Sequence, residues 1–286
     1  NSLGKFGLGL KTASTAFCRQ FSLISRTAEL QELCKVQWDL DYIAKTGSWM
    51  LQFPVIEEDE QEMLEQTAGQ GSGTLLVWDK IDRMMKDYKT FNNAAKGLRK
   101  ILDDLRFHLS MVFQRYLDEN DNRASNVQIS VNTQELEPWD PFCLKEAMTD
   151  TVQSEDVPVE LPDGKQAVFH ISAHIIPRKG EYSSIEAEKS ARGSNDFQGI
   201  YVYRENRLIH SGDWFGFLKK EPHFSLLRVD FSFDYRMDEL LSVDIKKSRI
   251  LLIGELASYI MNFLGAPRRE AEKRYRDKEN HLVQQQ

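Results

Sequence analysis

A glycine-rich segment near the start of the chain constrains its fold and chemistry more than any other feature. Residues 4–14 read Gly-Lys-Phe-Gly-Leu-Gly-Leu-Lys-Thr-Ala-Ser, with three glycines at spacings of three and two. Glycine permits backbone dihedrals and close approaches that other residues resist. A helix is expected over 10–17, so successive amide N–H groups would face an anion, and Lys11 would add a full positive charge. The segment predicts a phosphate-binding loop, and a plain tight turn is the alternative.

The same segment resembles the third sequence box of the GHKL ATPases, the superfamily of gyrase B subunits, the ninety-kilodalton heat-shock chaperone, histidine kinases and MutL. The sequence Gly-Lys-Phe-Gly-Leu-Gly-Leu-Lys over 4–11 is most similar to this box in MORC proteins and their bacterial relatives. In that family the box forms the hinge and tip of a lid that closes over ATP, with Gly4, Gly7, Gly9 and Lys11 as the implied phosphate contacts and Leu10 as lid packing. The resemblance implies a cofactor-binding segment made of Gly4, Gly7, Gly9, Leu10, Lys11 and Thr12.

Two further boxes of the superfamily are missing from the sequence. A helix with a catalytic glutamate and a magnesium-binding asparagine, and an Asp-x-Gly-x-Gly turn that reads adenine, precede the lid in these proteins. This chain begins three residues before Gly4. We therefore expect the chain alone to be inactive, with the general base and the magnesium ligand upstream. For the intact protein the resemblance implies ATP and Mg²⁺ as cofactors and slow ATP hydrolysis as the activity.

Composition narrows the class of protein. Hydrophobic residues make up 41% and charged residues 28% of the 286 residues, which is ordinary for a globular protein. No run approaches the roughly 18 apolar residues of a membrane span, so no membrane contact is expected. The three cysteines, Cys18, Cys34 and Cys143, show no paired spacing, which favours a reducing cytoplasm. A net charge of −7 argues against nucleic-acid binding over most of the surface.

The first domain is expected to span residues 1–85, as the C-terminal portion of a GHKL ATPase domain with its lid. Alternating and apolar runs predict strands over 20–26, 33–40, 49–54 and 74–77. The acidic run that starts at Glu57 leads into a glycine-rich stretch, and composition predicts a solvated loop there. An acidic metal site is the alternative for that run.

The second domain is expected over 86–250, followed by a helical segment over 251–286. Apolar residues at intervals of three and four predict a long amphipathic helix over 91–116. Strands are predicted over 127–131 and 226–233, and hairpins turn at Asp163-Gly164 and at Asn206. Pro267 is expected to bend the last helix or to mark a fresh start. The fold class is therefore α+β: the lid and closing strands of a GHKL α/β sandwich, then a β-α-β transducer-like domain with a C-terminal helix.

The histidines do not predict a metal site. His170 and His174 sit at helical spacing, but their neighbours alternate as in a strand, where the two side chains would lie roughly 13 Å apart. His108 lies beside the apolar stripe of the long helix, and packing or solvent exposure explains it.

A second cation for the phosphate is expected after a strand of the second domain. The sequence Leu-Ser-Val-Asp-Ile-Lys-Lys-Ser-Arg over 241–249 resembles the sensor loop of MutL and MORC-type transducers, which sends a basic residue to the γ-phosphate. A fixed cation there would stabilise the charge that shifts during transfer. Lys247 is the first choice for this catalytic role and Lys246 the second, with ordinary surface charge as the alternative.

The resemblance implies an ATP-driven conformational switch that dimerises and is DNA-linked or defence-related. The C-terminal helix carries an excess of basic residues, which could contact a nucleic-acid backbone, although a solvated or dimerising face is the simpler interpretation. A noncatalytic interaction module, or a chaperone-like remodeller of the same fold, is the alternative function.

Overall fold

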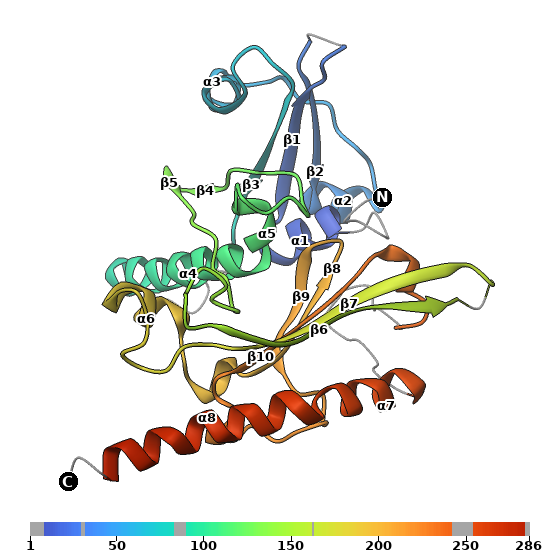
Figure 1. The fold of residues 1–286 in the computed structure, drawn as a ribbon. Coiled ribbons are helices and arrows are strands. Elements are labelled where there is room, and N and C mark those ends of the chain that lie inside the picture. Colours follow the sequence, from blue (N-terminus) through green and yellow to red (C-terminus); the bar gives the residue numbers. More distant parts are fainter. Residues whose placement is uncertain (1–8, 30–31, 83–89, 162, 242–253, 284–286) are drawn as a thin grey trace. The chain divides into compact units, whose positions relative to one another are not determined.

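The chain folds as a mixed α+β protein made of two compact units, Gly4–Arg99 and a second unit built on Lys100–Gln286. The computed structural model describes residues 9–29, 32–82, 90–161, 163–241 and 254–283 (Figure 1). The α+β class expected from the sequence is confirmed, while the division at residues 85 and 250 stays a prediction.

The first unit is organised around a three-stranded antiparallel sheet in the order β2-β1-β3. The central strand β1 (Gln20–Arg26) pairs with β2 (Cys34–Asp39) and with β3 (Gly73–Asp79), so Phe21 lies opposite both Trp38 and Trp78. These strands confirm three of the predicted ones. This unit also contains the helices α1 (Gly9–Phe17), α2 (Leu40–Thr46) and α3 (Glu58–Ala68).

Two predictions for the first unit were wrong. The strand expected over 49–54 is reduced to one bridge, between Gln37 and Gln52. The acidic run expected as a loop forms α3, because Glu57 and Glu60 make a capping box and the acids of the first turn suit the helix N-terminus. The Glu60 carboxylate also lies 2.7 Å from Lys35 Nζ, which ties the helix to β2.

The second unit contains a five-stranded sheet in the order β6-β7-β10-β8-β9. Neighbours pair antiparallel except β10 and β8, which are parallel. Both predicted hairpins are confirmed, and Asn206 adopts the expected left-handed conformation with φ 63°. The strands are β6 (Asp150–Glu160), β7 (Gln166–Ile175), β8 (Gly199–Arg204), β9 (Arg207–Asp213) and β10 (Leu227–Phe233).

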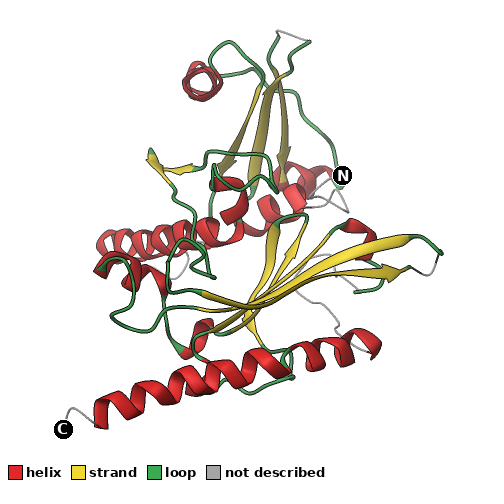
Figure 2. Ribbon diagram, viewed as in Figure 1, coloured by secondary structure: helices red, strands yellow, loops and turns green. Residues whose placement is uncertain are grey.

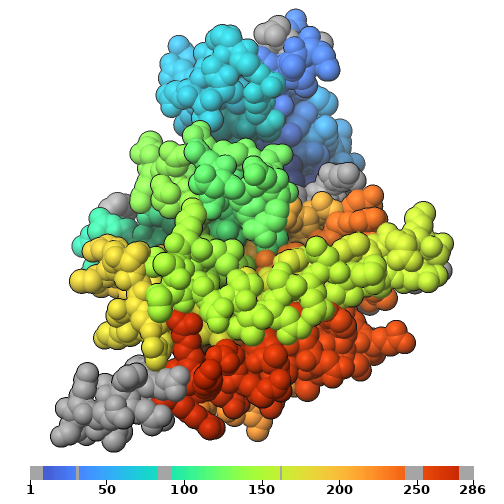
Figure 3. All heavy atoms as spheres, viewed as in Figure 1, coloured from blue at the N-terminus to red at the C-terminus, as the bar shows by residue number. Residues whose placement is uncertain are grey.

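Helices cover both faces of this sheet. On one face lie the helices α7 (Gly254–Phe263) and α8 (Gly265–Val283) (Figure 2). They pack over an apolar core that includes Phe169 and Phe231. The space-filling view shows the β6–β7 hairpin lying against α8 (Figure 3). On the other face, Tyr201 and Tyr203 pack against Trp139 and residues of α4 (Phe91–Val112).

Several remaining elements of the second unit have other bounds than the sequence predicted. The long predicted helix is interrupted at Phe113, which separates α4 from α5 (Gln114–Leu117). The strand expected over 127–131 is confined to β4 (Ser130–Val131), which pairs with β5 (Gln134–Glu135). Pro267 lies in the first turn of α8, so it marks a fresh start. Among the described residues, the unit also contains helix α6 (Ile185–Ala191) and three short 3₁₀ turns: Asn195–Phe197, Pro222–Phe224 and Tyr235–Met237.

None of the helices in the described part of the chain is both long enough and apolar enough to cross a bilayer.

Candidate phosphate-binding site

The helix that follows the glycine segment is firmly anchored at its far end. Ser14 is fully buried, and its hydroxyl accepts a hydrogen bond of 2.9 Å from the indole N–H of Trp78. The ring of Phe17 stacks on the same Trp78, with ring centroids 5.5 Å apart. The backbone N–H of Cys18 donates to the Ser14 carbonyl. The sheet therefore holds the C-terminal half of α1 in place.

The first turn of α1 is solvent-facing. Gly9, Leu10, Lys11 and Thr12 are all exposed, and the turn contains no acidic residue. A helix N-terminus carries partial positive charge and amide donors that lack intrahelical partners. A nine-residue helix with this N-terminus and a lysine in its first turn can accept an anion such as a phosphate group.

Packing does not require a glycine at position 9. A Cβ built on Gly9 would have no heavy atom within 4 Å. Any advantage of glycine there would come from the close approach of a ligand or from chain conformation before the helix. Gly4 and Gly7, the other two predicted glycine contacts, lie outside the described residues.

The Lys11 side chain has a definite position in the first unit. Its ammonium nitrogen lies 5.0 Å from the centroid of the Trp38 ring, a cation–π geometry. Trp38 in turn stacks on Phe21 of the central strand, with centroids 5.2 Å apart. The aromatic layer of the sheet thus supports the lysine beside the helix N-terminus.

The predicted catalytic lysines, Lys246 and Lys247, lie outside the described residues. Their assignment stays a prediction. The described residues also contain no group of three or more His, Cys, Asp or Glu side chains placed to hold a metal ion.

Sequence reasoning missed a buried polar row on β10. Arg228, Asp230 and Ser232 alternate with apolar residues and are turned toward one face of the sheet, where Arg228 and Asp230 are almost fully buried. Arg115 Nη2 lies 2.5 Å from Asp230 Oδ2, and its guanidinium stacks 3.6 Å above the Tyr203 ring. The alternation of charged and apolar residues in this strand was the available signal.

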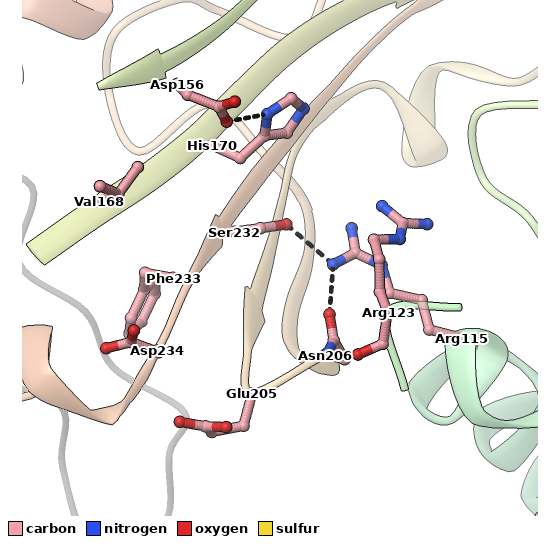
Figure 4. Close-up of a pocket in the computed structure, with 10 residues that line it drawn as sticks. All are labelled: Arg115, Arg123, Asp156, Val168, His170, Glu205, Asn206, Ser232, Phe233 and Asp234. Carbon is pink, nitrogen blue, oxygen red and sulfur yellow. Dashed lines mark hydrogen bonds and ion pairs between the residues drawn. The ribbon is translucent and has the colours of Figure 1, made fainter. Parts of the chain in front are cut away.

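Ser232 of this row and Arg115 line an open cavity of about 270 Å³ in the second unit (Figure 4). Most of its charges are already paired. Burial opposes the charge on Arg123, yet hydrogen bonding to Asp121 keeps the pKa of Arg123 above its usual value. His170 Nδ1 lies 2.8 Å from Asp156 Oδ1. The cavity is lined by Arg115, Arg123, Asp156, Val168, His170, Glu205, Asn206, Ser232, Phe233 and Asp234.

The two strand histidines have separate partners, as the strand spacing predicts. His170 pairs with Asp156, whereas His174 lies 2.9 Å from both the Thr151 and the Ser172 hydroxyl oxygens. Burial lowers the pKa of His174 to about 4, so it is neutral at pH 7. Both histidines are therefore explained by hydrogen bonding within the sheet.

Comparison with known proteins bears on the first unit. Residues 1–74 match the family model described as "Histidine kinase-, DNA gyrase B-, and HSP90-like ATPase". This part of the chain matches a GHKL-type ATPase domain. The match covers about a quarter of the 286 residues and includes the glycine segment, α1, β1 and β2.

The other comparisons, with curated proteins and with solved structures, identify no relative that assigns a function. No curated protein matches the chain. One similar solved structure contains the ATPase and transducer domains of DNA topoisomerase II from Balamuthia mandrillaris, at 9% sequence identity and a TM-score of 0.39. The alignment covers 97% of this chain and 66% of the chain in that structure. A likeness this weak assigns neither activity nor partner.

Proposed function

We propose that this chain is part of a GHKL-type ATP-binding protein in which the glycine segment and the first turn of α1 bind the phosphates of ATP. The observation that carries the proposal is the exposed N-terminus of α1, with Lys11 in its first turn, inside the residues that match the ATPase family model. Amide donors of Gly9, Leu10 and Lys11 would bind phosphate oxygens, and Thr12 would lie in the same turn. Gly4 and Gly7 would allow the backbone to approach the ligand closely.

A second cation would complete the phosphate site in the intact protein. We assign it to Lys247, with Lys246 as the second choice, because charge that shifts toward the leaving group needs a fixed counter-charge. Mg²⁺, when bound with ATP, would neutralise phosphate charge. Loss of the γ-phosphate would release the lysine, so ATP hydrolysis would drive a conformational switch. A homodimer and a MORC-like, DNA-linked or defence role are parts of the same proposal.

Ion pairs within the second unit limit the basic surface that α8 can offer to DNA. Three of its basic side chains are engaged within the second unit: Arg268 lies near Glu272, Lys273 near Glu270, and Arg274 near Glu181. Among the described residues of the helix, Arg269 and Arg276 have no such pair. The basic surface left for a phosphate backbone is therefore small.

The deciding experiment is calorimetric titration of ATP with Mg²⁺ into the full-length natural protein. We expect binding in the wild type, and weaker binding in Lys11→Met but not in Lys45→Met, an exposed lysine in the last turn of α2. A folded full-length protein that binds no ATP would instead support the noncatalytic interaction module. Equal weakening by both substitutions would show a general charge effect and reject the site.

A further inference from the structure

The segment that follows α2 presents its apolar side chains to solvent. Leu51, Phe53 and Val55 are 39%, 72% and 81% exposed, whereas the alternate residues Gln52 and Pro54 are half-buried. A half-buried strand ordinarily turns its apolar side chains toward the core. Here the alternation is reversed. We call residues 51–55 the apolar edge.

The backbone of the apolar edge is paired on one side. Gln52 exchanges two hydrogen bonds with Gln37 of β2, at 2.9 and 3.0 Å. In antiparallel pairing this turns the N–H and C=O groups of Leu51 and Phe53 away from β2. Within the described part of the chain, neither residue has a backbone hydrogen bond. The edge therefore offers free donors and acceptors to another strand.

Negative charge lies next to the apolar edge. Lys35 Nζ donates to the Val55 carbonyl at 3.3 Å and to Glu60 at 2.7 Å, which places the first turn of α3 beside Val55. Glu60 is the acid that Lys35 neutralises, and Lys35 forms no ion pair with another described acid of α3. The run from Glu57 to Ser72 contains six acidic residues and no lysine or arginine. Three of its exposed acids have no ion pair among the residues the structure describes: Glu58, Asp59 and Glu62.

We propose that the apolar edge binds an extended segment of a partner protein in which apolar residues alternate with lysine or arginine. The segment would add a strand through the free backbone groups of Leu51 and Phe53. Its apolar side chains would cover the exposed row, and its basic side chains would face the acids of α3. This charge disfavours a second copy of the chain, because a copy brings the same acidic run and a net charge of −7.

The test uses the full-length natural protein and two synthetic peptides, Lys-Val-Lys-Leu-Lys-Val-Lys and its counterpart with Glu in place of Lys. We expect only the basic peptide to bind, with an affinity that falls as salt rises. Phe53→Ser should weaken binding about tenfold or more, since it removes a large apolar contact. Glu58→Gln combined with Glu62→Gln should weaken binding and flatten its salt dependence. Val168→Ser, which alters an exposed apolar residue of β7, is the matched control and should change nothing.

Hydrogen exchange reports on the mode of binding. The amides of Leu51 and Phe53 should exchange rapidly in the free protein and become protected when the basic peptide binds. Equal binding of both peptides, or binding that Phe53→Ser leaves unchanged, would overturn the proposal. So would amides already protected in the full-length protein without peptide, because another part of that protein would then cover the edge. Concentration-dependent dimerisation that is lost in Phe53→Ser would assign the edge to a second copy.

Discussion

The ammonium nitrogen of Lys11 lies 5.0 Å from the centroid of the Trp38 ring, so the cation of the candidate phosphate site rests on an aromatic side chain of the sheet. A cation–π contact at an exposed site contributes roughly 0.5–1 kcal/mol. A charge-assisted hydrogen bond to a phosphate oxygen is stronger, so a nucleotide would draw Lys11 away from the ring. The environment of the Trp38 ring should therefore report on the position of the Lys11 side chain.

Binding of ATP should change the fluorescence of Trp38. Titration of the full-length protein with ATP should alter tryptophan emission in the wild type and in Lys45→Met. The change should be lost in Trp38→Phe, and Lys11→Met should bind ATP about tenfold more weakly, as expected for one charged hydrogen bond. An unaltered emission change in Trp38→Phe would show that the signal arises from another tryptophan, and the proposed movement of Lys11 would then lack support.

Lys247→Ala should lower the turnover of ATP far more than its affinity. A fixed cation that acts on the transferring phosphate contributes chiefly to the transition state, and removal of one such group costs about 100-fold in kcat. The measurement is steady-state ATP hydrolysis by the full-length protein. Lys246→Ala is the matched comparison and should have the smaller effect. If neither substitution changes kcat, the sensor assignment for this loop is wrong.

Local patterns predicted much of the fold because side-chain periodicity reports which residues face a core. The alternation in β2 and in the β6–β7 hairpin, and the turn at Asn206, all led to correct elements. Composition failed at α3, where the acidic run looks like a solvated loop. Its Glu57–Glu60 capping box starts a helix, and Lys35 of β2 neutralises Glu60.

The candidate site was predictable only in its local part. The glycine segment and the start of α1 are contiguous in sequence, so their chemistry can be inferred without a fold. The Lys11–Trp38 contact depends on β2 packing beside α1, which no spacing in the sequence encodes. The same holds for Arg115 and Asp230, which are separated by 115 positions and meet only through tertiary packing.

The stability of the second unit should fall between about pH 6.5 and pH 4. Burial lowers the pKa of His174 from 6.5 to about 4, so the unfolded chain takes up a proton first as the pH falls. The contribution of neutral, buried His174 to the free energy of unfolding is therefore complete above pH 6.5. It is lost as the pH falls toward 4, by at most about 1.4 kcal/mol for each pH unit. Urea unfolding at pH 7 and pH 5 should show a smaller difference for His174→Asn. His108→Asn, at an exposed position of α4, should keep the wild-type difference.

Removal of either partner of the Arg115–Asp230 pair should destabilise the second unit strongly. The two side chains are 1% and 4% exposed and meet at 2.5 Å, so a single substitution leaves a buried charge without its partner. We expect Arg115→Met or Asp230→Leu to lower the free energy of unfolding by about 3–5 kcal/mol. The double variant should lose less than the sum of the two, because it leaves neither charge unpaired. Urea unfolding gives all four values of the cycle.

Lys165→Met, which breaks the exposed pair with Asp163, is the control and should have no measurable effect. Strictly additive losses would mean that the two charges are stabilised independently, Arg115 by Tyr203 and Asp230 by Ser232 and by Arg123, whose Nη1 lies 3.7 Å from Asp230 Oδ2.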